Sequence, residues 1–355
     1  MAQDQVVVIL LVGALVLGIA LTPLSKWLAP HVGMMAQPRA RDVHTRPVPR
    51  MGGVAIFIAA MLVVAIFGGN GTIGEAGAII VAASLMSFLG LIDDRFTLSA
   101  YLRLLIQIGA ALFVWYAGTR IHLFATDWLD ATLTVIWIVG ITNAMNFLDN
   151  MDGLLAGISA VICAIFIVLA TLSGQWLIGA LSAALMGACL GFLFWNLNPA
   201  SVFMGDSGSM FLGFFLACVA IRLRFAQVPT VSWMVPLAVM AVPIFDTTLV
   251  VISRLRRGKN PLTTPGKDHT SHRLNLHGYT KREAVMILYL ISFVLGIVAI
   301  LITQFSETAA FALGLLPVAA GVFMLWYLEF GPWRLPDAPA PSQPRNSDAG
   351  LPQKP

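Results

Sequence analysis

The stretch VVVILLVGALVLGIALTPL, residues 6–24, decides the class of fold. It contains no charged residue and is long enough to cross the ~30 Å hydrocarbon core of a bilayer as one α-helix. No basic region precedes it and no small-residue cleavage site follows, so we interpret it as a retained span rather than a signal peptide. Similar apolar runs recur along the 355-residue chain, of which 58% is hydrophobic and only 11% charged. The sequence therefore predicts a multi-pass membrane protein rather than a soluble one.

Eleven apolar segments are expected to form transmembrane helices. They lie near residues 5–24, 52–68, 74–92, 100–118, 130–147, 154–172, 177–195, 207–222, 230–252, 284–303 and 309–329. We interpret residues 1–330 as one all-α membrane domain and the Pro- and Ser-rich segment 331–355 as a disordered cytoplasmic tail. The three cysteines fall inside apolar segments without metal-binding spacing, which indicates buried thiols rather than a disulfide or zinc site.

The placement of basic residues predicts the orientation. With the N-terminus outside, only Arg120, Arg222 and Arg224 of the 21 Lys and Arg residues lie on the outer side. The others fall in inner segments, mainly 25–51 and 253–283, as the positive-inside rule requires. We therefore expect a cytoplasmic C-terminus, and we attribute the net charge of +4 to membrane orientation rather than to nucleic-acid binding.

Six acidic residues lie at the predicted inner ends of spans although they are far apart in the sequence. They are Asp93, Asp94, Asp149, Asp152, Asp206 and Asp246. Because an ionised side chain is costly inside a membrane, we expect these residues to share a polar cleft at the cytoplasmic face. The segment NAMNFLDNMDGLLAG, residues 143–157, adds Asn146, whose spacing of three from Asp149 places both on one helical face. A solvated capping turn would also explain Asp93 and Asp94.

The segments around Asp206 and Asp246 indicate which ligands the cleft would hold. Asp206 lies in the turn MGDSGS, residues 204–209, where glycine allows close approach and a starting helix offers free N–H groups to a phosphate. Asp246 follows Pro243, which is expected to break the span, and it precedes a basic loop. Carboxylates near many Lys and Arg side chains, without a zinc-type Cys or His pattern, favour magnesium and phosphate groups. We therefore expect phosphoryl-group chemistry at the cytoplasmic membrane surface.

Five motifs resemble those of the polyprenyl-phosphate N-acetylhexosamine-1-phosphate transferases of glycosyltransferase family 4. In chain order they are HTRPVPRMGGVAIF (44–57), GLIDDR (90–95), NAMNFLDNMDGLLAG (143–157), NPASVFMGDSGSMFLG (198–213) and PIFDTTLVVISRLRRGKNPLTTPGKDHTSHRL (243–274). The sequence looks closer to the WecA/TagO-like branch than to the related MraY branch. The resemblance implies an all-α enzyme of the bacterial plasma membrane that acts in the first membrane step of a cell-envelope glycan pathway, such as lipopolysaccharide O-antigen or teichoic acid synthesis.

The resemblance also implies a reaction. N-acetylhexosamine-1-phosphate, expected to be GlcNAc-1-phosphate, passes from a UDP-N-acetylhexosamine to undecaprenyl phosphate, giving undecaprenyl-diphosphate-sugar and UMP. The implied cofactor is Mg²⁺, with Mn²⁺ as a substitute. A phosphate monoester is mostly deprotonated at pH 7, so we expect positioning and electrostatic stabilisation to matter more than a general base. A covalent aspartyl-phosphate route stays open.

Each residue that matches a family motif takes an implied role. The implied catalytic residues are Asp93, Asp94, Asp149, His269 and His272. The implied substrate-binding residues are Asn146, Asp152, Asn196, Phe203, Arg46, Arg50, Arg254 and Lys267. Asp206 and Asp94 are the implied metal ligands, Asp206 being the principal one. The chain departs from the family pattern at Ser271, where relatives often carry a histidine, and the two remaining histidines could instead cap their loop.

Other classes remain open from the residues alone. An MraY-type phospho-MurNAc-pentapeptide transferase is the alternative within the family. A secondary transporter also places acidic residues and broken helices in a membrane, although it predicts charges near the midplane. An aspartyl intramembrane protease would need Asp149 and Asp246 to face each other. A homodimer is neither favoured nor excluded by the sequence.

Overall fold

The computed structural model describes residues 3–36, 47–67, 69–124, 126–225, 229–261, 264 and 266–335. The regular secondary structure of this part of the chain is α-helical apart from one antiparallel pair of two-residue strands, β1 (Met35–Ala36) and β2 (Val48–Pro49), in which Met35 pairs with Pro49. The prediction of an all-α architecture is thus confirmed.

The helices coincide with the segments predicted from the apolar runs. They are α1 (Gln3–His31), α2 (Gly52–Phe67), α3 (Gly69–Phe96), α4 (Ala100–Tyr116), α5 (Asp127–Leu148), α6 (Leu154–Leu172), α7 (Trp176–Asn196), α8 (Asp206–Arg222), α9 (Pro229–Ser232), α10 (Met234–Val239), α11 (Ala241–Arg256), α12 (Thr270–Leu276), α13 (Lys281–Gln304) and α14 (Glu307–Phe330). The predicted span 230–252 is formed by three helices, α9 to α11, so a break is present as expected. The break before α11 lies at Met240, and Pro243 falls in the first turn of α11, where proline is tolerated.

Within the described residues, seven helices are long and apolar enough to cross a bilayer. They are α1, α3, α5, α6, α7, α13 and α14, and the shorter helices α2 and α4 are also apolar. The chain is therefore a multi-pass membrane protein. The number of eleven crossings and the outside position of the N-terminus stay predictions.

Helix α8 forms the centre of the bundle. All of its residues from Ser207 to Ala220 are buried, and it packs against α3 and α5. Close packing at its start depends on glycine, because a Cβ atom on Gly90 of α3 would lie 2.2 Å from the carbonyl oxygen of Asp206. The absence of a side chain at Gly90 thus lets the end of α3 approach the beginning of α8, where the first acidic residues lie.

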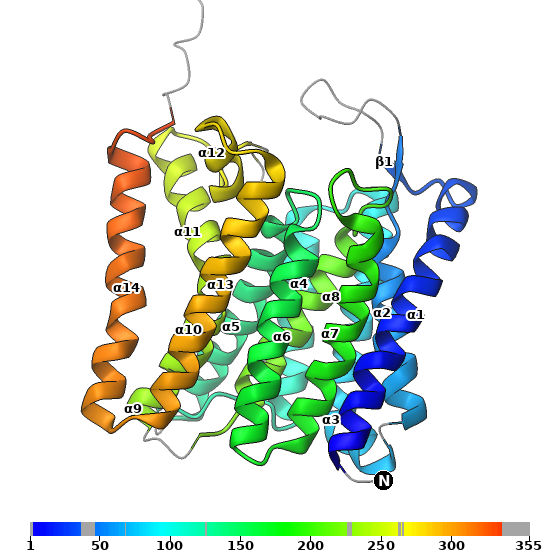
Figure 1. Ribbon diagram of the computed structural model, residues 1–355, viewed down its shortest axis with the longest axis horizontal. Helices are drawn as coiled ribbons and strands as arrows, with labels where there is room; N and C mark the ends of the chain where they lie inside the picture. Colours follow the sequence, from blue (N-terminus) through cyan, green and yellow to red (C-terminus); the bar gives the residue numbers. More distant parts are fainter. Residues whose placement is uncertain are drawn as a thin grey trace, which may run out of the picture.

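The two ends of the bundle differ in character (Figure 1). Helix α12 and strand β1 lie at one end, and the N-terminus lies at the other. Helix α14 stands at the edge of the bundle beside α11 and α13. Only 11% of its most apolar 18-residue stretch is buried. The end that carries α12 is the one that the orientation prediction assigns to the cytoplasm.

Candidate active site

The site begins with a carboxylate that caps α8. Asp94, in the last turn of α3, accepts hydrogen bonds from the backbone N–H groups of Asp206 (3.0 Å) and Ser207 (3.2 Å). The side chain of Asp94 is fully buried, and its Oδ1 atom lies 3.1 Å from Nε of Arg50. These contacts satisfy N–H groups that would otherwise be free at the start of α8. Asp94 therefore holds Asp206 in place, and its own oxygens are used within the protein.

Asp206 has a more open environment than Asp94. Its Oδ1 atom accepts hydrogen bonds from Nη2 of Arg50 and Nδ2 of Asn146, both at 3.2 Å, and its side chain is 20% exposed. Asn146 is itself fixed, because the same Nδ2 atom donates to Oγ of Ser209 at 2.8 Å. The carboxylate of Asp206 is thus oriented by Arg50 and Asn146, from two different segments, and stays accessible to a ligand.

Asp93 lies beside Asp206 through a shared arginine. Nη1 of Arg103, on α4, lies 2.6 Å from Oδ2 of Asp93 and 3.7 Å from Oδ2 of Asp206. The other oxygen of Asp93 accepts a hydrogen bond from the backbone N–H of Leu98 at 2.6 Å. Neighbouring residues on a helix point in different directions, so Asp93 faces the turn after α3 while Asp94 faces α8. The predicted convergence of Asp93, Asp94 and Asp206 is therefore present in the structure.

Asp149 directly follows the last residue of α5 and interacts electrostatically with the neighbouring acidic residues. Desolvation raises the pKa of Asp149 to about 7, the positive charge of Arg50 lowers it in part, and the negative charges of Asp206 and Asp152 raise it further. Asp149 thus changes its ionisation near neutral pH. The predicted proximity of Asp149 to the other acids is consistent with these interactions.

The histidines are held by an acid of another helix. Oδ2 of Asp246, on α11, lies 2.7 Å from Nδ1 of His269, and Oδ1 of Asp246 accepts the backbone N–H of Thr270 at 2.7 Å. Asp246 therefore anchors the start of α12 and leaves Nε2 of His269 for other partners. The ring of His272 lies 6.0 Å from that of His269. Burial lowers the pKa of His272 to about 4, with a further contribution from His269, so His272 is neutral at physiological pH.

The turn between α5 and α6 joins the acidic and histidine groups into one site. Asn146 on one side of this turn contacts Asp206, and the next residue, Phe147, meets the ring of His269 edge to face at 6.4 Å. Residues of three separate motifs consequently meet at this turn, and Arg50 and Asp94 from the two other motifs are linked to it through Asp206. This arrangement decides against the protease geometry, because Asp246 pairs with His269 rather than with Asp149.

Ser271 occupies the position at which the histidine motif departs from the family pattern. Its hydroxyl donates to Oδ1 of Asn150 at 2.5 Å. This bond ties α12 to the same α5–α6 turn. The serine therefore holds α12 against the α5–α6 turn.

Three predicted substrate-binding residues lie along the loops before α6 and α8. Asn196 is buried, and its amide accepts from the N–H of Gly153 and donates to the carbonyl of Val202, both at 2.9 Å. Asp152 accepts from Nδ2 of Asn198 at 2.8 Å. Phe203 is half-buried in the segment leading to Asp206. The polar groups of Asn196 are used inside the protein, so its role differs from the predicted direct contact with substrate.

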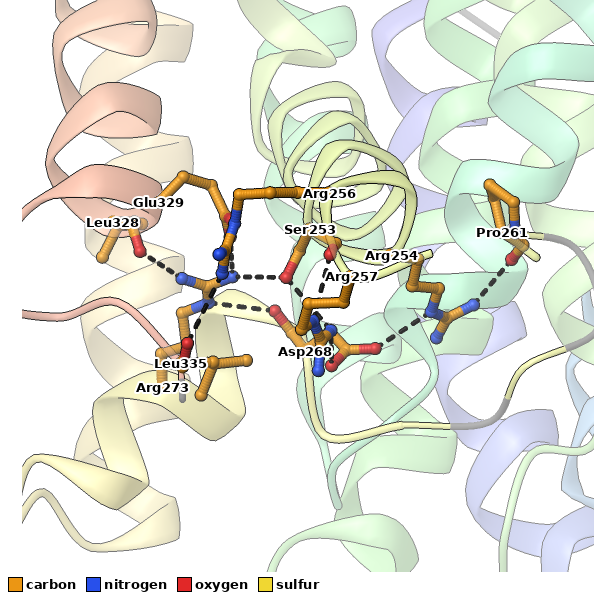
Figure 2. A network of polar contacts seen from close by, with 10 residues as sticks. All are labelled: Ser253, Arg254, Arg256, Arg257, Pro261, Asp268, Arg273, Leu328, Glu329 and Leu335. Atoms are coloured by element: carbon orange, nitrogen blue, oxygen red, sulfur yellow. Dashed lines mark hydrogen bonds and ion pairs between the residues drawn. The ribbon is translucent and has the colours of Figure 1, made fainter. Parts of the chain in front are cut away.

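The predicted basic substrate ligands behave differently from one another. Arg254 is buried, and its Nε atom donates to Oδ2 of Asp268 at 2.9 Å (Figure 2). Its guanidinium lies 5.6 Å from the ring centre of Phe147. It therefore supports the loop rather than reaching outward. Lys267 is exposed beside this loop, and Arg46 lies outside the described residues.

Arg103 is the main site residue to which sequence reasoning assigned no role. Ser99 caps α4 through a hydrogen bond from the N–H of Leu102 to its hydroxyl (3.2 Å), so Arg103 falls in the first turn of that helix. Only three residues separate α3 from α4. The short connection was the available signal, because it requires the first turn of α4 to lie near Asp93.

The donor set fits a hard divalent cation better than a transition metal. Within the described residues, no three His, Cys, Asp or Glu side chains form a complete ligand cluster. Magnesium commonly takes one or two carboxylates and completes its coordination with water and phosphate oxygens. Asp206 is the accessible carboxylate, with Asp93 beside it, whereas the oxygens of Asp94 already accept N–H groups. Asp206 is therefore the more accessible of the two predicted metal ligands, and the metal role of both residues stays a prediction.

Comparisons with known proteins agree with this geometry. Residues 76–224 match the model of glycosyl transferase family 4. A probable undecaprenyl-phosphate N-acetylglucosaminyl 1-phosphate transferase of Bacillus subtilis is 38% identical over 305 residues, covering 83% of this chain and 85% of the relative. The chain belongs to the polyprenyl-phosphate N-acetylhexosamine-1-phosphate transferases.

Other members of the family align over similar lengths. A decaprenyl-phosphate N-acetylglucosaminephosphotransferase of Mycolicibacterium smegmatis is 36% identical and covers 74% of both chains. The undecaprenyl-phosphate alpha-N-acetylglucosaminyl 1-phosphate transferase of Escherichia coli is 26% identical and covers 77% of both. Family membership places the acidic and histidine groups in an enzyme and disfavours the transporter interpretation.

Proposed function

We propose that this protein transfers GlcNAc-1-phosphate from UDP-GlcNAc to undecaprenyl phosphate in the bacterial plasma membrane. The observation that carries the proposal is the meeting of Asp93, Asp206 and two arginines at one end of a membrane-spanning bundle. A lipid phosphate and a soluble nucleotide can meet only where hydrocarbon and water adjoin, and this end of the bundle is such a place. The product would enter a cell-envelope glycan pathway at its first membrane step.

The chemistry is a phosphoryl displacement between two anions. An oxygen of the lipid phosphate forms a bond to the β-phosphorus of the UDP-sugar, and the bond from that phosphorus to the bridging oxygen of UMP breaks. UMP leaves with the electron pair. The main barrier is electrostatic repulsion, which fixed positive charges and precise alignment reduce.

Residues of the site divide this work according to their contacts. Arg50 and Arg103 bring positive charge to the acidic group, and each contacts two carboxylates. We assign the orientation of the lipid phosphate to Asp93 and Arg103, and phosphate hydrogen bonding to the free Nε2 atom of His269. Asp206 would hold Mg²⁺, which supplies charge neutralisation on the diphosphate when bound. Asp94 contributes by fixing Asp206.

The proposal is tested by UMP release from purified protein. UDP-GlcNAc, undecaprenyl phosphate and MgCl₂ should give UMP and a lipid-diphosphate-sugar in equal amounts, and omission of the lipid phosphate or the metal should stop release. Replacement of UDP-GlcNAc by UDP-MurNAc-pentapeptide or another UDP-N-acetylhexosamine identifies the donor. Absence of UMP with every donor would reject the transferase assignment.

A matched pair of variants links this activity to the site. Asp206→Asn should lower kcat by on the order of 10² or more, because loss of the proposed metal ligand would weaken the neutralisation of charge on the reacting phosphates. Asp127→Asn is the control, since Asp127 is exposed in the first turn of α5, at the end of that helix opposite to Asn146. Equal activity of the two variants would contradict the assignment of Asp206.

A further inference from the structure

Helix α14 has a buried glutamate at its last turn although most of the helix faces outward. Glu329 is 0% exposed, whereas neighbouring apolar residues such as Trp326 and Phe330 are more than half exposed. A buried carboxylate is costly unless it is paired and hydrogen-bonded. The partners of Glu329 therefore indicate what this end of α14 does.

Two arginines from other elements bind Glu329 (Figure 2). Nε of Arg256, on α11, lies 2.9 Å from Oε2, and Nη2 of Arg273, on α12, donates to Oε1. Arg273 is almost completely buried and also donates from Nη1 to the carbonyl of Leu328. The end of α14 thus holds one arginine side chain by both a carboxylate and a backbone carbonyl.

Arg273 carries this attachment to the histidine segment. Its Nε atom donates to the backbone carbonyl of Asp268 at 3.1 Å, and its Nη2 atom contacts Oγ of Ser253 at 3.1 Å. Asp268 is the residue immediately before His269, and its carboxylate accepts from Arg254 and Arg257. A continuous set of hydrogen bonds therefore leads from Glu329 through Arg273 to the backbone that presents His269.

Charge balance makes this set depend on Glu329. Four arginines and only two acids take part in it, namely Arg254, Arg256, Arg257, Arg273, Asp268 and Glu329. Asp268 pairs with Arg254 and Arg257, so Glu329 is the acid that pairs with Arg256 and Arg273. Loss of its charge would leave Arg273, which is buried, and Arg256, which is largely buried, without this carboxylate, and Arg273 would be expected to leave the Asp268 carbonyl.

We propose that Glu329 is a positioning residue for the transferase reaction, acting through Arg273 to fix the start of α12 and the ring of His269. This inference rests on the proposed function for its kinetic consequence but not for the contacts themselves. It gives the outermost helix of the bundle a part in catalysis without any contact with the reacting atoms. The ring of Trp333, just after α14, stacks on that of His277, just after α12, with centroids 3.9 Å apart. This is a second contact between the ends of these two helices.

The kinetic test compares the same substitution at two ends of α14. Glu329→Gln keeps the shape of the side chain but removes its charge, and we expect kcat to fall about tenfold or more while KM for UDP-GlcNAc stays within about threefold, because misplacement of a catalytic group acts mainly on the transition state. Glu307→Gln, in the exposed first turn of α14, should leave both constants unchanged. An unchanged kcat in Glu329→Gln would overturn the proposal.

A double substitution separates positioning from general destabilisation. If Glu329 acts through His269, adding Glu329→Gln to His269→Gln should lower kcat by less than about twofold further, since the group being positioned is already gone. Full additivity of the two losses would mean that Glu329 only stabilises the fold, and it would reject the proposal. Glu329→Asp keeps the charge on a shorter side chain and should lower kcat less than Glu329→Gln does. If Glu329→Gln does not fold, Glu329→Asp is measured instead: its loss of kcat should disappear when His269→Gln is present, and full additivity would reject the proposal.

Hydrogen–deuterium exchange tests the contact without reference to the reaction. Amides of residues 268–276 should exchange faster in Glu329→Gln than in wild type, and at the wild-type rate in Glu307→Gln. Unchanged exchange in this segment would refute the positioning role even in an active enzyme. An inactive wild-type protein with faster exchange in Glu329→Gln would reject the transferase assignment and retain the structural link.

Discussion

At the scale of single residues, two neighbouring acids of the site, Asp94 and Asp206, differ in role. Asp94 is buried and serves as the cap of α8, whereas Asp206 keeps its side chain partly open under the control of Arg50 and Asn146. The difference arises from the direction in which each carboxylate points and from the N–H groups available to it. Because Asp94 is buried and Asp206 is partly exposed, Asp206 is the carboxylate that a ligand entering the site reaches first.

Asp149 predicts the pH dependence of the reaction. Because its pKa is raised to about 7, the carboxyl is protonated below that pH and ionised above it. If the ionised form contributes to the site, kcat/KM should increase as the pH rises from about 6 to about 8, since this ratio reports groups of the free enzyme. The lipid phosphate also titrates near pH 6. The informative measurement is therefore the pH dependence of kcat/KM in wild type and in Asp149→Asn. The Asp149→Asn variant should lack the rise of kcat/KM near pH 7 that the wild type shows.

His272 supplies the control for this pH profile. Its pKa is lowered to about 4 by burial and by His269, so it carries no charge change between pH 6 and 8. His272→Gln should consequently keep the same rise near pH 7, at whatever absolute rate. A rise that vanished in His272→Gln and persisted in Asp149→Asn would reverse the two assignments.

At the scale of elements, the helix packing around α8 sets the geometry of the acidic group. Asp206 is the first residue of α8, so any displacement of that helix moves the carboxylate. The closest approach occurs at Gly90, where a Cβ would fall 2.2 Å from the Asp206 carbonyl oxygen. Backbone atoms on both sides leave no flexible side chain to give way.

Substitution at Gly90 tests this packing. Gly90→Ala should destabilise the protein by about 1–3 kcal/mol through overpacking, and it should lower kcat by moving Asp206. Gly77→Ala on the same helix is the control, because no atom lies within 4 Å of its Cβ position. Thermal unfolding in detergent and UMP release measure the two effects. Equal behaviour of the two alanine variants would mean that α3 and α8 are not in close contact at Gly90.

At the scale of the whole molecule, the polar contacts gather at one end of an otherwise apolar bundle. Arg50, Asp93, Asp206, His269 and Glu329 come from segments far apart in the sequence, and Figure 1 places α12 and β1 at the same end. The opposite end contains the connection between α6 and α7. The proposed reaction requires the end that carries α12 and β1 to face the cytosol, where nucleotide sugars are present.

Cysteine labelling in intact cells checks this orientation. The native cysteines Cys163, Cys189 and Cys218 are buried and should not react. Ser173→Cys, in the exposed α6–α7 connection, should react with a membrane-impermeant maleimide, whereas Arg334→Cys, exposed after α14, should react only after the membrane is opened. The reverse pattern would place the site outside and contradict the positive-inside prediction.

The amino-acid sequence by itself predicted most of the helices and the acidic residues that converge at one end of the bundle. Apolar runs specify their own helical structure in a bilayer, because backbone groups there must be paired within the segment. Asp93, Asp206 and His269 could be singled out because they lie in the same motifs that indicate the family. The prediction for span 230–252 was wrong in placing the break at Pro243, because proline is tolerated in the first turn of a helix and the chain breaks earlier, at Met240.

Only the tertiary structure decided what each polar residue does. The capping of α8 by Asp94, the bridge of Arg103 between two acids, and the binding of Arg273 by Glu329 all join residues from different helices. Local sequence encodes the propensity of one segment, whereas these contacts depend on how two packed segments are rotated and displaced relative to each other. A charge at the end of an apolar helix, such as Glu329, looks solvated in the sequence, and it becomes a buried partner only when neighbouring helices cover it.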